Sequence, residues 1–243
     1  MIKAGNLLAL DLIPMLYPGG ASMKQDSISV FDFDGTIASK DSAMEFFKWI
    51  FKGSITRSLI FYFLMPLLLL LTLTKTTRIY SFSIISYIAT ACQSRNLFRL
   101  RAEFVDYYLH DSGAVVFKGA LEKIKLHQKQ GDKIVIISGC PVWLLSGITK
   151  KLNLHNIRLI GSKLRFAQKG LLFKEHCYAS NKIKMAKERG LNPETWNYGY
   201  SDSPADIHWL KNCKRIHVIN PSPGKLKKFK NAINKEFTVL NWV

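Results

Sequence analysis

Common metal and disulfide signatures are missing from this 243-residue chain. Its four cysteines, Cys92, Cys140, Cys177 and Cys213, lie far apart and form no C-x-x-C pair, which argues against a zinc site and against a disulfide framework. The six histidines are scattered without metal-ligand spacing. A reducing compartment is therefore the simpler expectation.

Acidic residues are scarce. The chain has 17 Asp and Glu against 35 Lys and Arg, so its formal net charge is +18. Such a surface favours nucleic acid, an anionic membrane or phosphorylated substrates. The basic run from Lys225 to Lys230 is typical of a solvated face, and no aromatic stacking platform accompanies it, so we expect no nucleic-acid partner.

The N-terminus lacks a clean secretory signal. Its apolar stretch, Leu7 to Leu16, is interrupted by Asp11 and Pro14. We interpret residues 1–26 as an N-terminal extension, with Met23 as an alternative start.

One short stretch carries the clearest chemical signal. Ile28–Phe31 is β-branched and aromatic, which predicts a buried strand, and Gly35 then turns the chain. Asp32 and Asp34 are two residues apart, so we expect them to project from the same side of the strand end. Two carboxylates this close repel unless a cation lies between them or they share a proton. Mg²⁺ meets that need and leaves one carboxylate free to act as a nucleophile.

Strands and helices alternate along most of the chain. Apolar runs such as Ile134–Ile137 and Ile157–Ile160 predict strands of a parallel sheet. Residues 41–111 are the exception, because they are helical throughout and separate the first strand from the second. We predict a doubly wound, Rossmann-like α/β sheet formed by residues 27–40 and 112–243, with 41–111 inserted as a helical cap.

The cap contains an uncharged apolar segment. Residues 58–74 number 17 and include five consecutive leucines. As a helix they would reach about 25 Å, a little short of the roughly 30 Å hydrocarbon core, and Pro66 predicts a kink or a break. Such a helix can be buried in a soluble insert, but five leucines in a row leave no polar face for water, which favours membrane contact. Ile79–Cys92 instead carries a polar stripe and reads as amphipathic.

Asp32-Phe33-Asp34-Gly35-Thr36 resembles the first motif of the haloacid dehalogenase superfamily of phosphatases. Ser138-Gly139, Lys182 and the segment from Gly199 to Asp206 resemble the later motifs, in the same order. The helical insert resembles the C1 cap of phosphoserine-phosphatase-like members, and its apolar run is similar to that of phosphatidylglycerophosphatase C and its relatives. In the fourth motif, Tyr-Ser-Asp stands where many relatives have Gly-Asp.

The resemblance implies a phosphomonoesterase. Asp32 would attack phosphorus and form an aspartyl-phosphate. Asp34 would protonate the leaving alcohol and then deprotonate water. The hydroxyl of Ser138 and the backbone N–H of Gly139 would hold a phosphoryl oxygen, and Lys182 would neutralise the charge of nucleophile and phosphate.

The same resemblance implies a Mg²⁺ cofactor. Its ligands would be Asp32, the backbone carbonyl of Asp34, and Asp202. Asp206 would support this shell or cap the short helix that follows.

Three functions remain open from the sequence. The first is a phosphatase on the cytoplasmic side of a membrane, acting on a lipid phosphate such as phosphatidylglycerophosphate. The second is a cytoplasmic phosphatase for a small metabolite such as phosphoserine, with the leucine run packed inside the cap. The third is a catalytically silent protein that binds anionic surfaces.

The positions of the motifs restrict any membrane topology. Asp32 precedes the apolar segment and Lys182 follows it, so both flanks must lie on one side of the membrane. We expect a cap that dips into one leaflet rather than a helical hairpin that crosses it, because a crossing hairpin would bury the polar stripe in lipid. The cations Arg57, Lys75, Arg78 and Arg95 are then expected near the headgroups.

Overall fold

The computed structural model describes residues 27–74, 77–91 and 96–243. The expected extension at residues 1–26, and Lys75 and Arg95 in the cap, lie outside these ranges. The strands are β1 (Ile28–Phe31), β2 (Lys133–Pro141), β3 (Ile157–Ala167), β4 (Gly170–Glu175), β5 (Trp196–Ser201), β6 (Arg215–Ile219) and β7 (Phe237–Leu240). The helices are α1 (Ser42–Lys52), α2 (Ile55–Thr72), α3 (Arg78–Thr90), α4 (Leu97–His110), α5 (Lys118–Lys129), α6 (Val142–Lys151), α7 (Asn181–Glu188), α8 (Ile207–Leu210) and α9 (Pro223–Ala232).

Within the described residues, the strands form one sheet in the order β4-β3-β2-β1-β5-β6-β7. All neighbours pair in parallel except β3 and β4, which form an antiparallel hairpin. Gln168 and Lys169 turn this hairpin with positive φ angles of 39° and 65°. The predicted Rossmann-like α/β fold is confirmed, with β4 as an antiparallel edge.

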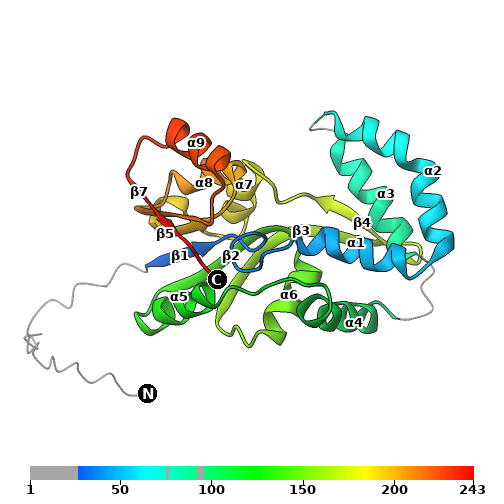
Figure 1. The fold of residues 1–243 in the computed structure, drawn as a ribbon, viewed down its shortest axis with the longest axis horizontal. Coiled ribbons are helices and arrows are strands. Elements are labelled where there is room, and N and C mark those ends of the chain that lie inside the picture. Colours follow the sequence, from blue (N-terminus) through cyan, green and yellow to red (C-terminus); the bar gives the residue numbers. More distant parts are fainter. Residues whose placement is uncertain (1–26, 75–76, 92–95) are drawn as a thin grey trace, which may run out of the picture.

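Helices cover both faces of the sheet (Figure 1). One core cluster joins the sheet to α1, α4, α5 and α6, and a second joins it to α7, α8 and α9. β1 is buried along its whole length between β2 and β5. The chain continues from β2 to one edge of the sheet and from β5 to the other, so the carboxyl end of β1 lies at a topological switch point, where such sheets bind ligands.

The described part of residues 41–111 is helical, as expected. Asp41 caps α1 by accepting a hydrogen bond from the backbone of Met44 at 2.8 Å. α2 runs from Ile55 to Thr72 without the break that Pro66 predicted. Figure 1 shows α2 and α3 as a pair of helices that projects beside the core.

The α2 helix exposes most of its apolar side chains. Leu68 is its one fully buried residue, while Phe63 is 84% and Leu70 is 63% exposed. By length and composition, α2 is apolar enough to cross a membrane, with a mean hydropathy of 1.9 and 6% of its residues buried. The expectation that a soluble cap would pack the leucine run inside is therefore wrong, because the rest of the cap covers only one side of this helix.

The α3 helix is bonded to the core through its polar stripe. Ser83 donates to the carbonyl of Phe173 at 3.1 Å, and Thr90 accepts from the backbone N–H of Leu171 at 2.8 Å, both in β4. Arg57, which we expected near headgroups, instead binds the carbonyls that end α3, with its Nη2 2.7 Å from the oxygen of Ala91. The polar stripe thus has protein partners, so α3 belongs to the core side of the cap.

Candidate active site

The loop after β1 depends on a glycine. Gly35 has a φ of +80°, and a Cβ placed there would lie 2.4 Å from the Cγ of Asp202. Both the turn and this close approach require the missing side chain. Thr36 completes the contact by accepting from the backbone N–H of Asp202 at 3.0 Å. The segments of the first and fourth motifs are therefore in direct contact.

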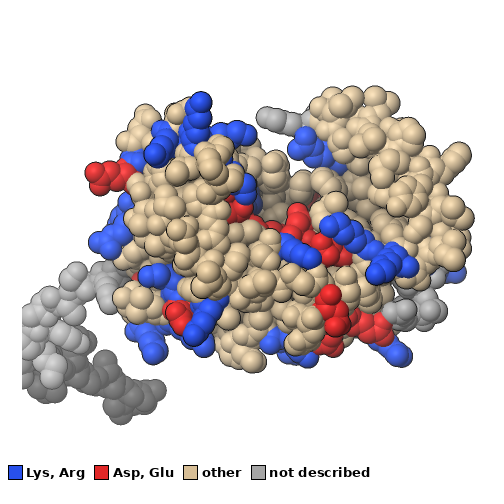
Figure 2. All heavy atoms as spheres, in the orientation of Figure 1, with Lys and Arg blue, Asp and Glu red and all other residues tan. Residues whose placement is uncertain are grey.

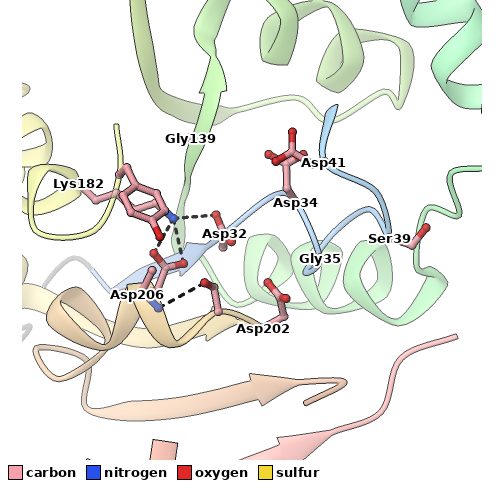
Figure 3. Close-up of a pocket in the computed structure, with 12 residues that line it drawn as sticks. Asp32, Asp34, Gly35, Ser39, Asp41, Gly139, Lys182, Asp202 and Asp206 are labelled. Atoms are coloured by element: carbon pink, nitrogen blue, oxygen red, sulfur yellow. Dashed lines mark hydrogen bonds and ion pairs between the residues drawn. The ribbon is translucent and has the colours of Figure 1, made fainter. Parts of the chain in front are cut away.

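Asp32 is buried beside a lysine. The Nζ of Lys182 in α7 lies 2.9 Å from Oδ1 of Asp32, and Asp206 holds the same ammonium at 2.7 Å (Figure 3). Burial by itself would lower the pKa of Lys182, but the charges of Asp206 and Asp32 outweigh it and raise that pKa. The side chain of Asp206 makes no helix-capping hydrogen bond. It pairs with Lys182 instead.

The charge of Asp32 is disfavoured by its surroundings. Burial raises the pKa of this carboxyl, Lys182 opposes that rise, and the charges of Asp206 and Asp202 add to it. A further cation in the pocket would favour the ionised carboxylate that nucleophilic attack requires.

Asp34 has different partners. Its Oδ1 accepts from the backbone N–H of Ser42 at 2.8 Å, and its Oδ2 accepts from the hydroxyl of Ser138 at 3.1 Å. Figure 3 shows it beside Asp41, away from Lys182. Burial, and then the charge of Asp41, raises the pKa of Asp34 to about 6.

The expected mutual repulsion of Asp32 and Asp34 does not shape this site. Both side chains line the same pocket, but their carboxylates point to different partners. The reason is local: β1 ends at Phe31, so the alternation of a strand does not extend through the loop. The carboxylates that crowd Asp32 come from the β5 end of the sheet.

Of the two residues that the resemblance implies for holding a phosphoryl oxygen, Gly139 lines the pocket and Ser138 does not. Ser138 is fully buried; its hydroxyl donates to Asp34 and accepts from the backbone N–H of Cys140 at 2.9 Å. Gly139 lines the pocket itself. In this structure the Ser138 hydroxyl therefore orients Asp34 rather than facing the space for a phosphate.

Asp202 already attracts a cation. The Nζ of Lys225 in α9 lies 2.5 Å from its Oδ2. In the part of the chain that the structure describes, no group of three His, Cys, Asp or Glu side chains forms a ready metal site. The implied set has two carboxylates, Asp32 and Asp202, plus the carbonyl of Asp34. Hard oxygen donors of this kind fit Mg²⁺, which keeps several water or phosphate ligands.

These groups surround one cavity of ≈ 300 Å³. Of the residues expected from the sequence, all but Ser138 line it. Residues that sequence reasoning missed also line it, namely Ser39, Asp41, Tyr178, Ser203 and Ala205. The motifs gave no signal for Asp41 in the pocket, or for the contact of Lys225 with Asp202.

Comparisons with known proteins agree with this architecture. The sequence profile of haloacid dehalogenase-like hydrolases matches residues 29–211. A search of curated proteins found no match.

Solved structures share the fold at low sequence identity. A protein of unknown function from Bordetella pertussis Tohama I is 17% identical with a TM-score of 0.69, covering 89% of this chain and 98% of that chain. A phospho-aspartyl intermediate analogue of phosphoserine phosphatase is 16% identical with a TM-score of 0.54, covering 89% and 94%. Cytosolic 5′-nucleotidase IIIB bound to cytidine is 13% identical with a TM-score of 0.56, covering 88% and 81%.

Proposed function

The chain belongs to the haloacid dehalogenase-like hydrolase family, and we propose that it hydrolyses phosphate monoesters through an aspartyl-phosphate. One observation carries the proposal: a buried Asp32 held by Lys182 shares a pocket with Asp34, a carboxyl whose pKa is raised to about 6. A nucleophile with a fixed cation and a nearby acid that is partly protonated near neutral pH are the groups that this reaction needs.

Each residue has a defined part in the proposed reaction. An oxygen of Asp32 attacks phosphorus, and the bond from phosphorus to the leaving alcohol breaks. Asp34 gives its proton to that alcohol oxygen and then takes a proton from the water that attacks the aspartyl-phosphate. Lys182 offsets charge on the transferring phosphoryl group, and Ser138 orients Asp34. Mg²⁺ held by Asp32, the carbonyl of Asp34 and Asp202 would supply further charge neutralisation.

A test uses p-nitrophenyl phosphate with Mg²⁺. Asp32→Asn keeps the shape of the side chain but removes the attacking charge, so turnover should fall to background while the melting temperature shows a folded protein. Asp106→Asn, on the surface of α4, is the matched control, because its side chain is 57% exposed. Substantial Mg²⁺-dependent turnover by Asp32→Asn would show that Asp32 is not the nucleophile.

The proposed substrate is a lipid phosphate, presented at the cytoplasmic face of a membrane, such as phosphatidylglycerophosphate. Its support is the exposed apolar surface of α2, together with the net charge of +18. The hydrogen bonds of Ser83 and Thr90 hold α3 against β4. This favours a cap in which α2 enters one leaflet of the membrane over one in which α2 and α3 cross the membrane as a hairpin.

Sedimentation with lipid vesicles distinguishes a membrane-bound phosphatase from a soluble one. Phe63→Glu or Leu70→Glu in α2 should abolish sedimentation with vesicles that contain anionic lipids, and turnover of p-nitrophenyl phosphate should persist. Leu126→Glu in α5, where the side chain is 44% exposed, is the matched control and should still sediment. A wild-type protein that stays in the supernatant would favour the small-metabolite phosphatase.

A further inference from the structure

A second cavity adjoins the catalytic pocket. It measures ≈ 680 Å³, and Tyr178 lines both spaces. Its walls come from α3, the β3–β4 hairpin and α7. Figure 2 shows a hollow between the core and the α2–α3 pair, with acidic side chains in it, and an almost uncharged surface over α2 and α3.

Two of the four Lys and Arg side chains that line this second cavity, Lys163 and Lys184, are paired with carboxylates. Lys163 lies 2.7 Å from Glu175 and 3.0 Å from Glu188, and Lys184 binds the same two carboxylates at 3.2 and 3.6 Å.

In contrast, Arg78 and Lys174 form no ion pair among the residues that the structure describes. The guanidinium of Arg78 has one long bond, 3.4 Å, to the carbonyl of Thr72. The cavity therefore keeps net positive charge from these two side chains.

His176 links the second cavity to the catalytic pocket. Its Nε2 would lie 3.9 Å from a Cβ placed at Gly139, and its ring stacks on Tyr178 with centroids 5.5 Å apart. Burial, then the charges of Arg78 and Lys182, lowers the pKa of His176 to about 4. The charges of the catalytic lysine and of Arg78 therefore both act on this imidazole.

A third cavity continues from the second. It measures ≈ 690 Å³ and shares Ile79 and Lys174 with its neighbour. Its walls are mostly apolar and aromatic, from α2, α3 and β4, and they include Leu64, Ile84, Tyr87 and Leu172. The molecule therefore presents, in sequence, a catalytic pocket, a basic cavity and an apolar groove.

We propose that Arg78 and Lys174 form a second anion-binding subsite for the leaving group, and that the groove beyond binds its acyl chain. This inference rests on the proposed phosphatase function and names its substrate class. The substrate is an amphiphile whose terminal phosphomonoester is separated from its chain by a second anionic group, such as a phosphodiester. Charge complementarity selects the second group, and burial of the chain adds apolar contact.

The test compares two probes. One is decyl phosphate, which has a chain and one phosphate. The other is glycerol 3-phosphate joined through a phosphodiester to a decyl chain, which adds the second anion. In Arg78→Gln and in Lys174→Gln, kcat/KM for the two-anion probe should fall about tenfold, since a charged hydrogen bond is lost. The value for decyl phosphate should change less than about twofold.

A control variant removes the same charge elsewhere. Lys129→Gln, on the exposed end of α5 and outside all three cavities, should leave both probes unchanged. Equal effects of Arg78→Gln on both probes, or none on either, would overturn the subsite.

Failure of the phosphatase function itself gives a different result. Wild-type protein would then turn over neither p-nitrophenyl phosphate nor the probes. Calorimetric binding of the two probes would still decide the subsite, because only an anion site at Arg78 and Lys174 gives the two-anion probe an advantage that the variants lose.

Discussion

Lys225 binds Asp202, one of the residues that would hold Mg²⁺, and the competition between its ammonium and the metal can be measured. Its Nζ lies 2.5 Å from Oδ2 of Asp202, and the lysine side chain is 42% exposed. A partly exposed ion pair of this kind is worth about 0.2–1 kcal/mol. Mg²⁺ must displace the ammonium from that oxygen, so the pair subtracts its free energy from metal binding. Lys225→Met should therefore tighten Mg²⁺ binding by up to about fivefold.

Titration calorimetry with Mg²⁺ measures this change directly, without substrate. The rise in melting temperature with Mg²⁺ concentration gives a second readout. Lys228→Met, an exposed lysine of the same helix, is the matched control and should keep the wild-type affinity. Weaker or unchanged Mg²⁺ binding in Lys225→Met would refute the reasoning, because it would place the metal where this ammonium does not compete.

Three further changes test other parts of the structure. Gly35→Ala should abolish activity and lower the melting temperature, whereas Gly190→Ala, with a φ of +73° but open space around it, should show only backbone strain of about 1–3 kcal/mol by urea unfolding. Asp206→Asn should cost about 3–5 kcal/mol of unfolding free energy, since it leaves Lys182 buried with one partner fewer; a loss under 1 kcal/mol would contradict a buried ion pair. Burial, and then nearby cations, lowers the pKa of His217 to about 4, so the unfolded state binds more protons between pH 6.5 and 4 and stability should fall as pH falls through that range. His217→Phe should flatten this part of the pH profile, and an unchanged slope would show that another group titrates there.

Local patterns were sufficient for most of the elements. Ile28–Phe31 forms a strand with the bounds that its apolar run predicted, and the runs Ile134–Ile137 and Ile157–Ile160 lie within β2 and β3. Asp41, whose short carboxylate suits this position, caps the first helix. These features depend on neighbours in the sequence: buried strands need uninterrupted apolar residues, and caps need a short acceptor.

The site was less predictable because it depends on contacts between distant segments. The motifs named Asp32, Lys182 and Asp202, but the pairing of Lys182 with Asp206 depends on where α7 meets the end of β5. Lys225 reaches Asp202 only through the packing of α9. Strand alternation failed for Asp34, since the chain leaves the sheet before that residue.

The small share of α2 in the core has a consequence for protein engineering. Because Leu68 is its one fully buried residue, most positions of this helix carry little of the constraint that folding places on a sequence. The loop after β1, the end of β5 and α7 hold the reacting groups without it. The exposed residues of α2 can therefore be substituted without loss of the fold. A variant with charged residues at these positions should be more soluble than the wild-type protein.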